Sequence, residues 1–184
     1  MRNHQNHLGR RAQPRAPDFK YYRMLRPLEE FICDECGQVI ASPHDGYVEW
    51  EEGQDENGVH FARGFRIVHH APRSPLKTID GCYSYGDSRY RNDISLEYFI
   101  ENVHQYLASF LDLGLMHDAN HRIGCRISNF RQFTDFAKRL TIPYYEEARL
   151  YIPTAIQDGF CSDCNELALY TPDYLRRIIE RYAQ

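Results

Sequence analysis

Long apolar runs are absent from this sequence of 184 residues. No stretch approaches the roughly 18–20 consecutive apolar residues that a transmembrane helix needs. The first segment, "MRNHQNHLGRRAQPRAPDFK", also lacks the apolar core of a secretory signal. We therefore expect a cytoplasmic protein, in a compartment that keeps thiols reduced. The composition, with 42% hydrophobic and 26% charged residues, is typical of a folded globular chain.

Several catalytic signatures are missing as well. The chain contains no G-x-S-x-G, no phosphate-binding loop, no G-x-G-x-x-G and no H-E-x-x-H. Acidic residues do occur in adjacent pairs, such as Glu29–Glu30, Glu51–Glu52 and Glu146–Glu147. Adjacent side chains in a strand point to opposite faces, so we interpret these pairs as solvated charges rather than as acid/base partners.

Positive charge is concentrated at the N-terminus. Residues 1–28 carry seven Lys/Arg and one acid, a net charge of +6, which leaves −10 on the remainder because the chain sums to −4. Large apolar side chains are scarce at the start of this segment, so we expect residues 1–28 to form a disordered basic arm. Such an arm can contact nucleic acid, whereas the acidic remainder argues against a broad phosphate-binding face.

Cysteine is present and patterned. Two of the six cysteines, Cys33 and Cys36, lie in "FICDECGQVIA", and Cys161 and Cys164 lie in "FCSDC". In a reducing compartment a C-x-x-C pair is more often a metal ligand pair than a disulfide. The glycine directly after Cys36 permits the positive φ of a tight knuckle turn, which usually provides half of a zinc site made of four cysteines or of three cysteines and one histidine. The sequence therefore predicts structural zinc at Cys33 and Cys36.

The favoured completion of this site uses Cys82 and one histidine of "FRIVHH". Both lie within the same β-rich region as the knuckle, and a short loop closure costs less entropy than a long one. Neighbouring residues in a strand face opposite sides, so only one of the two histidines should bind the metal. We choose His70, with His69 as the alternative.

Two other completions are open. Cys161 and Cys164 would complete a site of four cysteines, but the C-terminal half of the chain would have to fold back onto the knuckle. The set His117, His121 and Cys125 is spaced by four residues, yet glycines lie before and within it. That segment is therefore better interpreted as a polar loop.

The first half of the chain has the pattern of strands. Residues 47–50 alternate between polar and apolar, a turn containing Asn57-Gly58 follows, and residues 59–68 return as a second strand. Gly64 is a candidate for a bulge within that strand. This hairpin is too small to be stable alone, and a metal ion would supply the missing stabilisation.

The second half has the spacing of helices. We predict helices over residues 96–111, 128–140, 143–152 and 171–182. Pro143 should start the third helix, and Glu146 and Glu147 in its first turn should stabilise the positive end of the helix dipole. Pro153 should bend or end this helix. The sequence therefore predicts an α+β fold in which a small zinc-stabilised antiparallel β module, residues 29–92, precedes a helical half of three to four helices, residues 93–184.

The segment "VHHAP", downstream of a C-x-x-C pair, resembles the start of an HNH, or ββα-metal, nuclease motif. The resemblance implies metal-dependent hydrolysis of phosphodiesters, with His69 as metal ligand, His70 as general base, Asn92 to orient the base and His104 as a further ligand. Cys82 falls inside the span of that motif, where it is better placed as a zinc ligand. The nuclease is therefore the alternative to a non-enzymatic protein.

The stretch "RLTIPYYEEARLYI" and the later "DGF" resemble segments of bacterial proteins that carry an N-terminal zinc knuckle. This resemblance implies a bacterial, intracellular setting and brings no activity with it. Our leading prediction is a non-enzymatic zinc-binding interaction or regulatory protein. We expect a protein partner, nucleic acid as an alternative partner through the basic arm, and no membrane.

Overall fold

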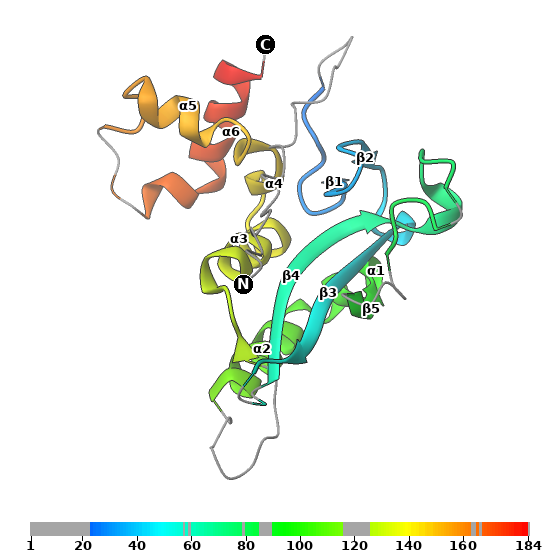
Figure 1. Ribbon diagram of the computed structural model, residues 1–184. Coiled ribbons are helices and arrows are strands. Elements are labelled where there is room, and N and C mark those ends of the chain that lie inside the picture. The colour runs from blue at the N-terminus through cyan, green and yellow to red at the C-terminus, as the bar shows by residue number, and fades with distance from the viewer. Residues whose placement is uncertain are drawn as a thin grey trace, which may run out of the picture.

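The computed structural model describes residues 23–183, apart from residues 57, 59, 79, 85–89, 116–125, 163–164 and 166. Strands occupy the N-terminal half and helices most of the C-terminal half, so the predicted α+β class is confirmed. Figure 1 shows a curved hairpin beside α3, with the last helices at one end of the molecule. Some predicted features lie outside the described residues: most of the basic arm, Cys164, His117, His121 and Cys125.

The main sheet has four strands in the order β5-β3-β4-β6. The strands β3 (Gly46–Gln54) and β4 (His60–His69) form the predicted antiparallel hairpin. β5 (Tyr90–Ser95) pairs with β3, and the two-residue β6 (Arg126–Ile127) runs parallel to β4. The sheet thus also draws on residues beyond the predicted β module. A separate two-stranded sheet pairs β1 (Phe31–Ile32) with β2 (Val39–Ile40).

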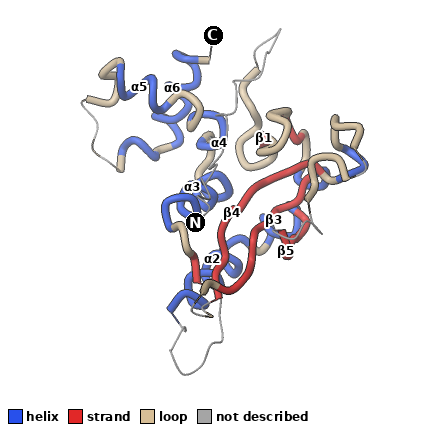
Figure 2. The backbone as a smooth tube through the Cα atoms, viewed as in Figure 1, coloured by secondary structure: helices blue, strands red, loops and turns tan. Residues whose placement is uncertain are grey.

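Gly64 lies at the predicted bulge. Its φ is +68°, a conformation that favours glycine. The register of the hairpin shifts between the pairs Glu49–Arg66 and Glu51–Arg63, so β4 accommodates one extra residue there. A bulge increases the local twist of a strand pair, and the hairpin curves along its length (Figure 2).

Aromatic side chains join the sheet to the helices that pack on it. The helices concerned are α1 (Leu96–Glu101), α2 (Val103–Leu115) and α3 (Phe130–Thr141). The ring centre of Phe65 on β4 lies 5.0 Å from that of Phe110 on α2 and 5.2 Å from that of Phe136 on α3. Each such ring contact adds to the stabilisation gained from burial alone. The predicted helix over residues 96–111 is divided at Asn102.

The helix predicted over residues 143–152 is replaced by two short helices, α4 (Tyr145–Ala148) and α5 (Ile152–Gln157). Pro153 lies in the first turn of α5, where its missing N–H breaks no helical hydrogen bond, so it helps to begin a helix rather than to end one. The last helix, α6 (Pro172–Tyr182), begins after Thr171 as predicted. None of the described helices is long and apolar enough to cross a membrane.

A second apolar cluster connects α4 with α6, through Tyr145, Ala148, Leu175, Ile179 and Ala183. Residues just before β1 pack against this region. Leu25 is 7% exposed, and its N–H donates to a carboxylate oxygen of Glu147 at 2.8 Å. Residues 23–28, which the sequence assigns to the basic arm, are therefore part of the described structure.

Glu30, interpreted above as a solvated charge, is instead a buried carboxylate in this N-terminal segment. Its side chain is 1% exposed, and it accepts a hydrogen bond from the Arg23 guanidinium at 2.7 Å and another from the Arg26 N–H at 2.8 Å. The hydrogen bond from Arg23 is the largest influence on the carboxyl, and together with Arg26 it outweighs burial and lowers the pKa of Glu30 to about 2.

Glu30→Gln should lower the free energy of unfolding by about 1–2 kcal/mol at neutral pH, a modest loss because both arginines are solvent-exposed. The folded pKa lies below the unfolded value of about 4.3, so the stabilisation is present above about pH 5 and fades as the pH falls towards 2. Urea unfolding at a series of pH values checks this. If the difference in unfolding free energy between the wild-type protein and the variant did not shrink on acidification, the prediction would be wrong.

Candidate metal centre

The C-x-x-C segment forms the predicted knuckle between β1 and β2. The Cys33 N–H donates to the Gln38 carbonyl, and the Gly37 N–H donates to the Cys33 carbonyl, both at 2.9 Å. Gly37 has a φ of +73°, the left-handed conformation for which glycine is best suited. The local sequence therefore dictates the turn that presents both thiols on one side.

Four side chains with metal-binding atoms converge at this turn: Cys33, Cys36, His69 and Cys82. Their ligand atoms all lie within 4.8 Å of one another. The Nδ1 atom of His69 is 3.5 Å from the Cys36 Sγ and 3.8 Å from the Cys82 Sγ. Bonds of about 2.3 Å to sulfur and about 2.0 Å to nitrogen in a tetrahedral zinc site would separate such ligands by about 3.6 Å. The spacing therefore fits a metal centre of three cysteines and one histidine.

The histidine in the cluster is His69, and the first choice of His70 is corrected. His69 is 5% exposed at the end of β4, and its Nε2–H donates to the Val39 carbonyl at 3.2 Å. This hydrogen bond leaves the Nδ1 lone pair directed at the thiols, as is usual for a metal-binding histidine. His70 is half-buried beside Tyr47, with their ring centres 5.0 Å apart. Only His69 of the pair faces the thiols, in agreement with the expectation that neighbouring residues of a strand face opposite sides.

Among the described residues, the remaining candidate ligand, Cys161, does not join the cluster. Cys161 is half-buried and lies outside it. Within the described part of the chain, no second group of three or more histidine, cysteine or acidic side chains has its ligand atoms close enough to hold a metal. The described residues therefore favour the completion within the β-rich half.

The residues of the nuclease resemblance have separate surroundings. His69 belongs to the cluster with the three thiols. The Asn92 amide donates to the Glu52 carboxylate, and His104 is exposed on α2. The nuclease site built on His70 and Asn92 stays a prediction.

The thiols have unequal acidities when no cation is near. Burial opposes ionisation of Cys33, but the interaction with His69 and hydrogen bonds from the N–H groups of Cys36 and Glu35 outweigh it and lower the pKa of Cys33 to about 7. Burial raises the pKa of Cys36 to about 12 and also raises the pKa of Cys82. Three adjacent thiolates need a compensating cation, and a divalent metal ion would supply it.

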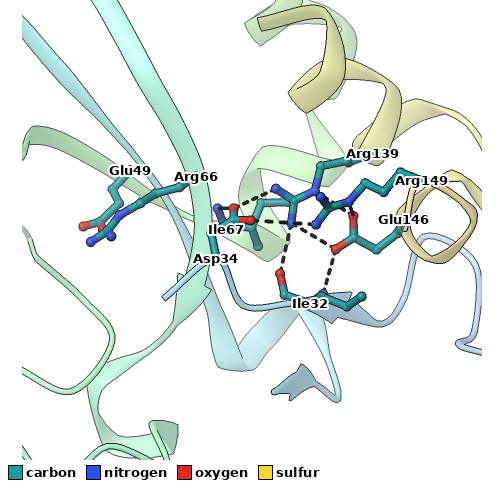
Figure 3. Close-up of polar contacts among 8 residues, drawn as sticks. All are labelled: Ile32, Asp34, Glu49, Arg66, Ile67, Arg139, Glu146 and Arg149. Atoms are coloured by element: carbon teal, nitrogen blue, oxygen red, sulfur yellow. Dashed lines mark hydrogen bonds and ion pairs between the residues drawn. The ribbon is translucent and has the colours of Figure 1, made fainter. Parts of the chain in front are cut away.

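Both acidic residues inside the C-x-x-C pair are held by arginines. Asp34 accepts hydrogen bonds from the Arg139 guanidinium at 2.6 Å and from the Ile67 N–H at 2.7 Å. Arg139 is 4% exposed and also donates to the Glu146 carboxylate and to the Ile32 carbonyl (Figure 3). This single arginine on α3 therefore ties the knuckle to β1 and α4.

The second arginine, Arg66 on β4, forms an ion pair with Glu35. It pairs with the Glu35 carboxylate at 2.7 Å and with the fully buried Glu49, and it donates to the Ser84 hydroxyl at 2.6 Å. Burial raises the pKa of Glu49 even though Arg66 opposes the shift. The knuckle is thus fixed by ion pairs on both sides as well as by its own backbone.

These buried carboxylate contacts could not be predicted from the sequence. Glu146 and Glu147, interpreted above as solvated charges, are 5% and 4% exposed and accept hydrogen bonds from Ile32 and Leu25 N–H groups. The only local signal is that both acids of "CDEC" lie between two cysteines, where a knuckle turn holds them close to the sheet.

Comparison of the chain with protein-family models, with curated proteins and with solved structures found no match. The function is therefore argued from the residues and contacts of this chain.

Proposed function

We propose that Cys33, Cys36, His69 and Cys82 hold one structural zinc ion. The observation that carries this proposal is the convergence of four ligand atoms within 4.8 Å of one another. Four protein ligands complete a tetrahedral zinc site and leave no position for a water or a substrate, which is the arrangement of structural rather than catalytic zinc. Thiolate and imidazole ligands also favour zinc over magnesium or calcium, which prefer oxygen ligands.

On this basis the chain is a non-enzymatic interaction or regulatory protein that depends on zinc for the shape of its β-rich half. The ion would join the knuckle, the end of β4 and the segment that carries Cys82. β1 and β2 have only two residues each, so the pairing of these strands alone gives this region little stability. The free energy of metal binding would then be part of the free energy of folding.

A protein partner fits the described surface better than nucleic acid does. Residues after 28 carry a net charge of −10, which repels phosphates. Several large apolar side chains are exposed, among them Tyr98, Phe130 and Leu167. Aromatic residues of this kind are enriched in protein interfaces.

The histidine pair provides a matched test. His69→Gln should reduce the zinc content from about one equivalent to near zero after dialysis, whereas His70→Gln should retain about one equivalent, because only the first side chain faces the thiols. Elemental analysis of the purified wild-type protein and of both variants checks this. A wild-type protein that takes up no zinc would refute the site. Plasmid cleavage in Mg²⁺ or Mn²⁺ that His70→Ala abolishes would replace this proposal with the nuclease.

A further inference from the structure

A polar cavity of about 720 Å³ lies among α3, α4 and α5, and none of the four metal-ligand residues lines it. Small-molecule sites in proteins usually have volumes of about 300–1,000 Å³. The cavity is therefore large enough for a small organic ligand. The residues that line the cavity indicate which kind of ligand it would bind.

Positive charge dominates the lining. Arg131, Lys138 and Arg149 contribute three cations and Asp135 one carboxylate, a formal excess of two positive charges. Arg149 shares its charge with Glu146, whose carboxylate lies 3.3 Å from its Nε. Arg131 and Lys138, in contrast, form no ion pair with any described residue. Arg131 thus remains available to a ligand, and the ammonium group of Lys138 is balanced by no described carboxylate although it also lies over the Tyr145 and Tyr170 rings.

The first turn of α3 adds to this positive wall. Asn129 caps the helix by accepting a hydrogen bond from the Gln132 N–H at 3.0 Å, and the turn contains no acidic residue. The partial positive charge of a helix N-terminus normally attracts an acid, but here Arg131 occupies the turn. Ile152 and Pro153 of α5 add an apolar part to the lining.

We propose that this cavity binds a small organic phosphate, with the phosphoryl group between Arg131 and Lys138 and the organic group against Ile152 and Pro153. A phosphate monoester carries about −1.5 to −2 charge at neutral pH and can pair with both Arg131 and Lys138, whereas a monocarboxylate supplies about half as much charge. The arginine guanidinium suits phosphate oxygens through paired hydrogen bonds. None of the residues proposed to hold zinc lines this cavity.

Calorimetric titration of the whole chain with phenyl phosphate, inorganic phosphate and benzoate tests the proposal at about 0.15 M salt, where non-specific attraction is screened. Phenyl phosphate should bind, inorganic phosphate should bind more weakly for lack of the apolar contact, and benzoate should bind at least about tenfold more weakly than phenyl phosphate. Arg131→Gln and Lys138→Gln should each weaken phenyl phosphate binding about tenfold or more.

Two matched control variants distinguish binding in the cavity from non-specific attraction to positive charge. Arg176→Gln removes an exposed cation on α6, and Arg15→Gln removes one from the basic N-terminal segment; neither should change the affinity. Lys138 also lies over the Tyr145 and Tyr170 rings, so the exposed Arg131 provides the variant with less risk to folding. No binding of phenyl phosphate at millimolar concentration, equal losses in the control variants, or benzoate binding as tightly as phenyl phosphate would each overturn the proposal.

Discussion

Cys33→Ser should release about one equivalent of zinc and lower the melting temperature by roughly 10 °C or more, the largest effect that we expect from a single substitution. The Cys33 thiol is 1% exposed, and its backbone forms two of the knuckle hydrogen bonds. A serine hydroxyl at that position cannot replace a thiolate ligand, so the ion would lose a quarter of its coordination. The remaining buried thiols and His69 would then be left without the cation that compensates them.

Cys161→Ser is the matched control for this experiment, because Cys161 is a half-buried thiol outside the cluster. It should keep the wild-type zinc content. Thermal unfolding followed by circular dichroism, together with elemental analysis, measures both quantities in the same samples. If Cys33→Ser retained its zinc and its melting temperature, the four side chains would not form a metal site.

The knuckle could be predicted from sequence because it is local. Cys33, Cys36 and Gly37 lie within five residues, and the conformation that the glycine permits decides the turn. Cys82 followed from its position in the same half of the chain. Such inferences need no knowledge of how distant segments pack.

The choice between His69 and His70 required the tertiary structure. By strand alternation His69 shares a face with Phe65 and Ile67, and His70 shares the other face with Val68. All three of these apolar residues are buried, so both faces of this part of β4 are covered. Hydrophobic alternation therefore does not reveal which face meets the thiols.

The contacts between the knuckle and the helices are harder still to predict. Asp34 and Arg139 are 105 residues apart in the chain, and no periodic pattern relates them. Pro153, which by itself suggests the end of a helix, instead begins α5 after the chain has turned at α4. Both outcomes depend on where α3 and α4 dock, which local propensities do not encode.

Arg139→Gln should lower the free energy of unfolding by about 3–5 kcal/mol, because it leaves the buried or half-buried carboxylates of Asp34 and Glu146 with only their longer contacts to Arg149. The control is Arg63→Gln, which breaks an exposed arginine–carboxylate pair with Glu51 and should cost about 1 kcal/mol or less. Urea unfolding measures both. Equal losses in the two variants would show that burial does not strengthen the Arg139 contacts.

Two double variants then show what Arg139 does. Adding Glu146→Gln to Arg139→Gln should restore part of the lost stability, since it removes a buried charge that has lost its shortest ion pair. Combining Arg139→Gln with Cys33→Ser should cost less than the sum of the two single losses, because Asp34 links the arginine to the metal-binding turn and each change already loosens that link. Strict additivity of the two losses in unfolding free energy would mean that the metal centre and the helical half are stabilised independently. Arg139 would then stabilise only the contacts among α3, α4 and β1.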